Sequence, residues 1–200
     1  MNMDEMDADA ALDPIALFQA WMQKAEESEL NDPSAVALAT ATPDGMPSVR
    51  MVLVKRADQR GFSFYTNAES QKGLELAENP RAAMCFHWKS LRRQVRIAGT
   101  VSELSPAEAD EYFHSRSRLS QFGAVASEQS RVLANRELLE ARVEELEKKF
   151  PDEIPRPAYW RGYVLRPERI EFWTNREGRL HDRILFSRSR DGWRKERLFP

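Results

Sequence analysis

The first strongly patterned stretch of the chain has the spacing of an amphipathic helix. Asp13 and Pro14 form a typical helix start, a side-chain cap followed by a proline in the first turn. Apolar residues then recur every three or four positions, at Ile15, Leu17, Phe18, Trp21, Met22 and Ala25. The pattern predicts a helix from Asp13 to about Leu30 that packs one face against a core.

Short apolar runs separated by turn sequences come next, which is the pattern of an antiparallel sheet. The first three expected strands are Ser34–Thr42, Ser48–Arg56 and Phe62–Thr66. Beyond a helix predicted over Ser70–Asn79, the further expected strands are Arg81–Trp88, Leu91–Leu104, Tyr159–Leu165, Arg169–Thr174, His181–Arg188 and Trp193–Leu198. Gly99 is expected to mark a bulge or bend in its strand.

Further helices are predicted between these strands. A capping box at 105–108 opens a helix that carries Tyr112 and Arg116 one turn apart, with Ser120 in the same row if the helix continues. A charged helix is predicted over Val132–Phe150. The fold class is therefore mainly β with peripheral helices (α+β), a closed or nearly closed antiparallel barrel. Residues 13–200 are expected to form one domain, after a disordered acidic tail over residues 1–12.

The composition is that of an ordinary globular protein. Hydrophobic residues make up 42% and charged residues 31%, and the net charge of −2 does not favour a nucleic-acid or acidic-membrane partner. The single cysteine, Cys85, excludes an internal disulfide. Because the sequence also lacks the pattern of a secretory signal or of a membrane span, a cytoplasmic location is predicted.

One short segment near the end combines cations with an imidazole. In a strand, Arg179, His181 and Arg183 would alternate onto one face. Two guanidinium groups beside an imidazole are suited to a phosphate or an electron-rich heteroaromatic ring. The structural alternative is a solvated edge strand in which Asp182 acts as a local counter-charge.

Other cations lie within apolar or helical segments. Arg50 and Lys55 are five positions apart, so a straight strand would place them on opposite faces. Lys72 lies in the first turn of its helix, where a bound anion would be favourable. Tyrosine, guanidinium and serine groups at Tyr112, Arg116 and Ser120 would form a phosphate clamp. These groups exceed the need of one phosphate, which indicates two phosphorylated ligands, a cofactor and a substrate.

Several common site types have no counterpart in the sequence. It contains no P-loop, no dinucleotide-binding glycine motif and no nucleophile elbow. The three histidines and one cysteine show no metal-ligand spacing, so no metal is expected.

Five motifs in one order carry a family resemblance. RMVLVK, FYTN…SQKG, RRQVRI.G, YFHSR…SQ.GA.AS.QS and EFW…..RLHDR resemble the pyridoxamine 5′-phosphate oxidase family, from about Asp13 to Pro200. The resemblance implies an FMN-binding split β-barrel of Greek-key type. It also implies a homodimer with FMN held between the subunits, and no nucleic-acid or membrane partner.

The resemblance also assigns site residues. FMN binding is implied for Arg50, Met51, Val52, Leu53, Val54, Lys55, Tyr65, Thr66, Gln71, Lys72, Gln94, Gln129, Ser130, Trp173 and Arg183. Substrate binding is implied for Lys55, Tyr112, Arg116, Ser120, Arg179, Leu180 and His181. The implied catalytic residues are Arg179 and His181, which would hold the pyridine ring against the flavin and assist proton loss.

The implied reaction is oxidation of pyridoxamine 5′-phosphate and pyridoxine 5′-phosphate to pyridoxal 5′-phosphate. A hydride would pass from the substrate C4′ carbon to flavin N5, and O2 would reoxidise the flavin and release H2O2. The chain departs from the family pattern at Gln71, where arginine is common, at Ser117, where proline is common, and at Thr174, where glutamine is usual. Its acidic tail also lacks the basic, tyrosine-containing segment that covers the substrate in some members.

Three alternatives stay open. A related flavin oxidase could act on a phenazine-type ring, since such relatives share the SQKG form, but the Tyr112, Arg116 and Ser120 clamp argues against a substrate without phosphate. A non-catalytic flavin- or haem-binding barrel would not need Arg179 and His181. A nucleic-acid-binding barrel would show steep salt dependence.

Overall fold

The structure is a computed structural model that describes residues 12–200. The predicted tail over residues 1–12 falls outside this part of the chain except for its last residue. Within residues 12–200, the helices are α2 (Pro14–Ser28), α3 (Gln71–Glu78), α4 (Pro106–Ser115), α5 (Arg118–Ala126) and α6 (Arg136–Lys149). A short 3-10 turn, η1 (Glu177–Arg179), lies near the end.

The strands of this part of the chain form one sheet with antiparallel pairing throughout. They are β1 (Ala35–Ala41), β2 (Pro47–Leu53), β3 (Arg56–Asp58), β4 (Gly61–Asn67), β5 (Arg81–Trp88), β6 (Arg93–Glu103), β7 (Trp160–Thr174), β8 (Asp182–Ser189) and β9 (Gly192–Arg197). The order is β2-β1-β5-β6-β7-β4-β3, and β8 and β9 extend from β7. The prediction of an antiparallel, mainly β fold with peripheral helices is confirmed.

The longest strand, β7, connects two parts of the molecule. Its first half pairs with β4 and its second half pairs with β8, while β6 runs along both. The sequence predicted two strands here, and that prediction was wrong. Pro167 is accommodated because it lies opposite Gly99 at a register shift, where its missing N–H breaks no regular ladder. A side chain at Gly99 would meet the Arg166 carbonyl oxygen at 2.0 Å, so this bulge requires glycine.

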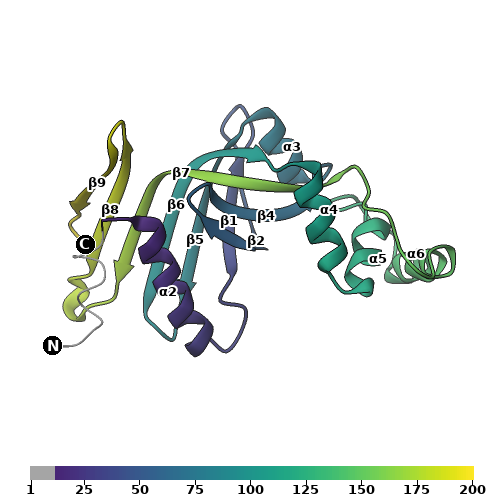
Figure 1. The fold of residues 1–200 in the computed structure, drawn as a ribbon, viewed down its shortest axis with the longest axis horizontal. Coiled ribbons are helices and arrows are strands. Elements are labelled where there is room, and N and C mark those ends of the chain that lie inside the picture. Colours follow the sequence, from purple (N-terminus) through teal and green to yellow (C-terminus); the bar gives the residue numbers. More distant parts are fainter. Residues whose placement is uncertain (1–11) are drawn as a thin grey trace.

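Helix α2 lies across one face of the sheet, as Figure 1 shows, and its apolar side chains join the core there. The ring of Phe18 packs against Phe62 and Phe86, with centroids 4.8 and 5.0 Å away. Trp21 meets Phe172 edge-on at 5.1 Å. Burying each such ring contributes about 1.5–3 kcal/mol, so the helix anchors the sheet through its apolar face. The helix begins at the predicted cap, and it ends at Ser28, two residues before the predicted end.

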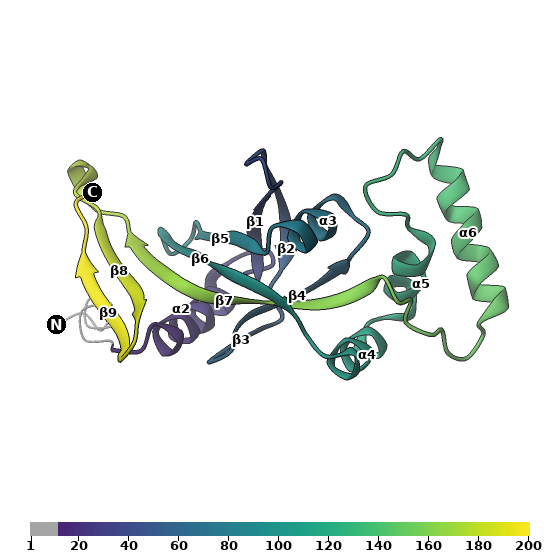
Figure 2. The same ribbon diagram turned by 90° about the horizontal axis from the view of Figure 1, so that it is seen from above.

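A second apolar cluster joins α4, α5 and α6 to the first residues of β7. It contains Phe113, Phe122, Ile154 and Trp160. Figures 1 and 2 both place this helical end of the molecule opposite the end formed by β8 and β9. The fold is therefore elongated, with β7 running between its two ends.

The predicted strand Ser48–Arg56 divides into β2 and β3. The Val54 amide donates to the Ser34 carbonyl at 3.0 Å, whereas the next amide, of Lys55, donates to the Ser63 carbonyl at 2.8 Å. Between these two residues the chain therefore stops pairing with the β1 segment and begins to pair with β4. As a result, Arg50 and Lys55 need not lie on opposite faces, and both line one cavity.

The predicted helix through Tyr112, Arg116 and Ser120 also divides in two. Arg116 has an extended conformation (φ −76°, ψ 156°), and the Ser117 side chain accepts the Ser120 amide as the cap of α5. Helix α6 begins later than predicted because Asn135 caps it, with its side chain accepting the Leu138 amide at 2.9 Å.

Candidate active site

A cavity of about 990 Å³ opens between β2, β4 and the helices α3, α4 and α5. It gathers most of the residues for which ligand contacts were predicted. The predicted residues that line it are Arg50, Met51, Val52, Leu53, Lys55, Tyr65, Thr66, Gln71, Lys72, Tyr112, Arg116, Ser120, Gln129 and Ser130. Among residues 50–55, Val54 does not line the cavity. It is only 5% exposed and belongs to the core.

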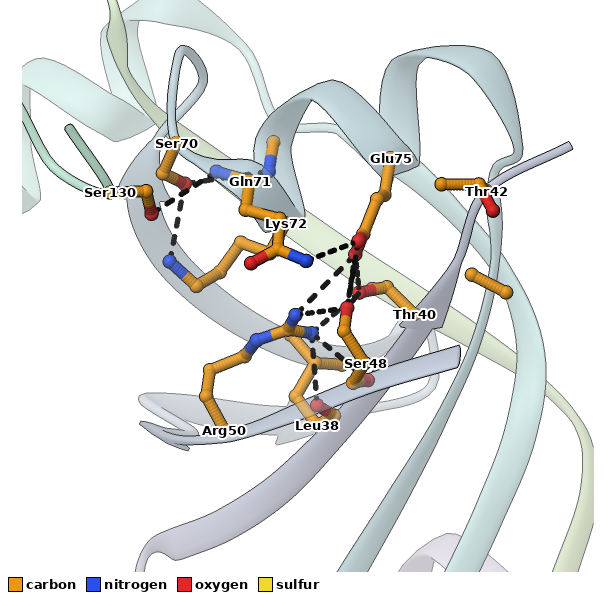
Figure 3. A network of polar contacts seen from close by, with 12 residues as sticks. Leu38, Thr40, Thr42, Ser48, Arg50, Ser70, Gln71, Lys72, Glu75 and Ser130 are labelled. Atoms are coloured by element: carbon orange, nitrogen blue, oxygen red, sulfur yellow. Dashed lines mark hydrogen bonds and ion pairs between the residues drawn. The ribbon is translucent and has the colours of Figure 1, made fainter. Parts of the chain in front are cut away.

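Arg50 projects from β2 towards α3, as Figure 3 shows. Its Nη1 donates to the Leu38 carbonyl at 3.2 Å and to the Thr40 hydroxyl, and its Nη2 donates to the Ser48 hydroxyl. Glu75 of α3 lies 3.4 Å from Nη2. The guanidinium is thereby fixed at the wall of the cavity.

Lys72 lies in the first turn of α3, where Ser70 caps the helix. Lys72 is almost fully buried, and its ammonium group lies 3.2 Å from the Ser70 hydroxyl and 2.9 Å from the Gln129 side-chain oxygen. Burial and the charge of Arg50 lower the pKa of Lys72 to about 8, although Glu75 opposes the shift. A bound anion would add to the counter-charge of Glu75 and favour the ammonium form of Lys72.

Arg116 is a further cation that lines the cavity. Its guanidinium lies over the Trp160 ring, 5.1 Å from the centroid. Its Nη1 is buried and has no hydrogen-bond partner among the described residues. Burial also lowers the pKa of Arg116 below its usual value. A buried guanidinium nitrogen without an acceptor costs free energy, so this position is suited to an anionic ligand.

Three aromatic rings in the wall of the cavity form a stack beside Arg116. Tyr65 and Tyr112 are stacked at 4.1 Å, and Tyr65 and Trp160 at 5.4 Å. The rings fix the position of Tyr112 beside Arg116. Sequence reasoning missed Trp160 as part of this wall, because none of the five motifs includes it.

A second group of predicted residues lies on the opposite end of the sheet. Gln94, Trp173 and Arg183 are direct cross-strand partners on β6, β7 and β8, so their side chains share one face. The His181 ring lies 4.6 Å from the Trp173 ring. The buried carboxylate of Glu171 accepts from Arg183 Nε at 2.8 Å and holds that guanidinium.

The prediction that Arg179, His181 and Arg183 alternate along one strand was wrong. Arg179 lies in η1 with φ 62°, directly after Gly178 with φ 63°, and β8 begins only at Asp182. These two left-handed residues turn the chain before the strand starts. Asp182 pairs with Arg176 at 2.5 Å and with Arg197 at 3.0 Å, so its carboxylate stabilises the turn.

The two groups of residues are far apart within one chain. Trp160, in the wall of the cavity, and Trp173, beside His181, are thirteen positions apart on β7, which corresponds to roughly 40 Å along a strand. Figure 2 shows β7 running from the β8–β9 end of the molecule to its helical end. The structure therefore places the first group together in one cavity. Six predicted residues do not line that cavity: Gln94, Trp173, Arg179, Leu180, His181 and Arg183.

Two features are absent among the described residues, a metal-binding cluster and a membrane-spanning helix. Residues 12–200 contain no cluster of His, Cys, Asp and Glu side chains able to hold a metal ion. In the same range, every helix is too short or too polar to cross a membrane.

The fold is that of a split-barrel protein, and its cavity is lined by cationic side chains. The pyridoxamine 5′-phosphate oxidase family profile matches residues 22–150, and the pyridoxine 5′-phosphate oxidase C-terminal dimerisation region matches residues 160–200. The chain belongs to the pyridoxamine 5′-phosphate oxidase family. The second match places a dimerisation region in β7, β8 and β9 and supports a dimer.

Relatives and solved structures agree with this assignment. A pyridoxine/pyridoxamine 5′-phosphate oxidase from Gluconobacter oxydans is 58% identical over 193 residues, which is 96% of each chain. One from Erythrobacter litoralis is 56% identical, covering 94% of this chain and 91% of the relative. PhzG from Burkholderia lata, solved with tetrahydrophenazine-1-carboxylic acid, is 35% identical with a TM-score of 0.92, covering 98% of this chain and 96% of PhzG.

Proposed function

We propose that this chain oxidises pyridoxamine 5′-phosphate and pyridoxine 5′-phosphate to pyridoxal 5′-phosphate, with O2 as acceptor and H2O2 as the second product. The observation that carries the proposal is the pair of separate cationic sites in one cavity. One site contains Arg50 and Lys72, and the other contains Arg116 with its unpartnered buried nitrogen. Two phosphorylated ligands, a cofactor and a substrate, match this arrangement. The names of the relatives at 56–58% identity support it independently.

The proposed cofactor is FMN, with its phosphate at Arg50 and Lys72. The residues present fit that group, because a buried lysine and a fixed guanidinium lie beside the N-terminus of α3. Gln129 and Ser130 approach the same point, where Ser130 accepts the Gln71 amide at 3.2 Å. When bound, the flavin would supply the hydride acceptor.

The proposed substrate phosphate lies at Arg116, with Tyr112, Ser120 and Lys55 around it. All four residues line the cavity, and the aromatic stack holds Tyr112 in place. Charge-assisted hydrogen bonds from Arg116 would provide most of the orientation, and the hydroxyl groups would complete the shell. In this role the chain fixes one end of the substrate so that the reacting carbon has a defined position.

The remaining residues are proposed to come from the partner subunit of a homodimer. Arg179 and His181 would act on the substrate ring, and Gln94, Trp173 and Arg183 would contact the flavin across the interface. The edge strand β2 supports an interface beside the cavity, because Val49, Met51 and Leu53 on it are 68%, 63% and 36% exposed. A second copy of the chain would cover these apolar side chains.

The phenazine-type alternative has less support. PhzG is 35% identical to this chain, whereas the pyridoxine/pyridoxamine 5′-phosphate oxidases reach 58%. Arg116 also keeps a buried nitrogen without an acceptor, which a phosphate would satisfy.

Anaerobic mixing of the FMN-loaded protein with pyridoxamine 5′-phosphate tests the proposal. We expect the visible flavin absorbance to bleach, to return on admission of air, and pyridoxal 5′-phosphate to form. Pyridoxamine without its phosphate serves as the matched control and should react far more slowly at the same concentration. A flavin that stays oxidised with the phosphorylated amine would contradict the proposed substrate.

A further inference from the structure

Glu75 is a buried carboxylate beside the cations of the cavity, and the function proposed above gives it no role. It lies on α3 one turn after Gln71, and it is only 5% exposed. Its carboxylate accepts the Gln71 side-chain amide at 2.9 Å and the Ser48 hydroxyl at 2.6 Å, and it also accepts the Thr40 hydroxyl. Figure 3 shows it facing Arg50 across these groups.

Two hydroxyl groups connect Glu75 to Arg50. Thr40 and Ser48 each donate their single hydroxyl proton to the carboxylate, so their oxygen lone pairs face the guanidinium. Arg50 Nη1 donates to the Thr40 oxygen and Nη2 to the Ser48 oxygen. Both terminal nitrogens of Arg50 are therefore held on acceptors that Glu75 orients.

The charge of Glu75 persists at neutral pH. Burial alone would raise the pKa of this carboxyl, but the hydrogen bonds it accepts and the charge of Arg50 together lower the pKa below its usual value. The site therefore contains two cations, Arg50 and Lys72, and one anion. Its net charge is therefore +1. This is smaller in magnitude than the charge of a phosphate monoester, which is about −1.5 to −2.

We propose that Glu75 is an internal counter-anion of the phosphate site formed by Arg50 and Lys72. In the ligand-free protein it stabilises the buried cations, and it competes with a bound phosphate for the guanidinium of Arg50. It therefore raises the stability of the empty protein and lowers its affinity for the cofactor phosphate. This inference rests on the proposed role of Arg50 and Lys72 in holding FMN.

A purely positioning role for Glu75 would have a different outcome. If the carboxylate only held Arg50 in place, its loss would destabilise the empty protein and weaken FMN binding as well. If Glu75 is a counter-anion, its loss lowers the stability of the FMN-free protein but raises its affinity for FMN. The reason is that the charge that stabilises the empty site also repels the incoming phosphate. The signs of the two effects distinguish the roles.

The test replaces Glu75 with glutamine, which keeps the shape and accepts hydrogen bonds through its amide oxygen. We expect the FMN-free Glu75→Gln protein to unfold at a lower temperature than the wild type. We expect FMN to bind it roughly tenfold more tightly at low ionic strength, as measured by quenching of flavin fluorescence. The matched control is Glu168→Gln, because Glu168 also accepts a threonine hydroxyl (Thr100) and an arginine (Arg81), each at 2.8 Å, but lies outside the cavity. It should leave FMN affinity unchanged.

A second variant covers the case in which Glu75→Gln fails to fold. Glu75→Asp keeps a carboxylate but shortens the side chain by one methylene group, which moves the negative charge away from Arg50. We expect FMN to bind this variant more tightly than the wild type, and the FMN-free variant to unfold at a slightly lower temperature. Unchanged or weaker binding in either folded variant, with a wild type that binds FMN, would overturn this inference alone. A wild-type chain that takes up no FMN would overturn the proposed function together with it.

Discussion

Trp160 and Trp173 lie at opposite ends of one strand, β7, and each belongs to a different group of candidate site residues. Trp160 contacts Arg116 in the wall of the cavity, while Trp173 contacts His181. A single continuous strand thus holds the two groups apart by a fixed distance. The groups can meet only if the cavity of one subunit faces the β7–β8 end of another.

The first prediction concerns the two proposed phosphate sites. Arg116→Ala removes the guanidinium of the proposed substrate site and leaves Lys55, Arg50 and Lys72 in place. We expect the substrate KM to rise by about ten- to a hundredfold, as loss of a charge-assisted hydrogen bond of ~1.5–3 kcal/mol implies, with normal flavin content. Steady-state kinetics and the flavin-to-protein absorbance ratio measure both. Loss of flavin with unchanged substrate affinity would reverse the assignment of the two sites.

A pH dependence follows from the lowered pKa of Lys72, which is about 8. As the pH rises through this value the free protein loses the ammonium charge, so FMN affinity should fall between about pH 7 and pH 9. Lys72→Arg keeps the positive charge at every pH in this range, because a guanidinium does not deprotonate there. Fluorescence titrations should show a fall in affinity for the wild type and a flatter profile for the variant. Identical profiles would exclude Lys72 as the titrating group.

Arg179 is predicted to act on the substrate rather than on the cofactor. It is exposed and lies in the η1 turn, so Arg179→Ala should leave folding and flavin content unchanged. We expect turnover to fall by about tenfold or more because the ring of the substrate loses a positioning group. Activity equal to that of the wild type would remove Arg179 from the site.

A prediction about folding tests the bulge that keeps β7 continuous. Gly99→Ala places a methyl group 2.0 Å from the Arg166 carbonyl oxygen, where backbone must shift to accept it. We expect a loss of about 2–4 kcal/mol in the free energy of unfolding, measured by denaturant titration. Gly123→Ala is the control, since no atom lies within 4 Å of its added carbon and alanine favours a helix by about 0.5–1 kcal/mol. Equal stability of the two variants would argue against the bulge as a constraint.

Local sequence signals predicted most elements because their causes are local. Strand Arg81–Trp88 and the capping box at Ser105 match the structure, since alternation and capping depend on neighbouring residues. The joining of two expected strands into β7 was missed, because the position of Pro167 is permitted by Gly99 on another strand. The hydrophobic pattern of one segment does not show which residue of another strand lies opposite it.

The candidate site was predictable in its parts and not in its assembly. Anion-binding residue types identified Arg50, Lys72 and Arg116, all of which line the cavity. Glu75 was missed, because a lone glutamate on a helix resembles a solvated one until its burial is known. The strand geometry expected for Arg179 failed because Gly178 turns the chain through a left-handed conformation.

The most direct test of the central claim uses mixed dimers. Two subunits, one with Arg116→Ala and one with Arg179→Ala, are co-expressed with different tags and purified as heterodimers. If each site combines the cavity of one subunit with Arg179 of the other, one site of each heterodimer contains both changes and the other contains neither. We predict that heterodimers regain about half of the wild-type activity, while each parent homodimer stays impaired. Heterodimers no more active than the average of the two parents would contradict a site shared between subunits.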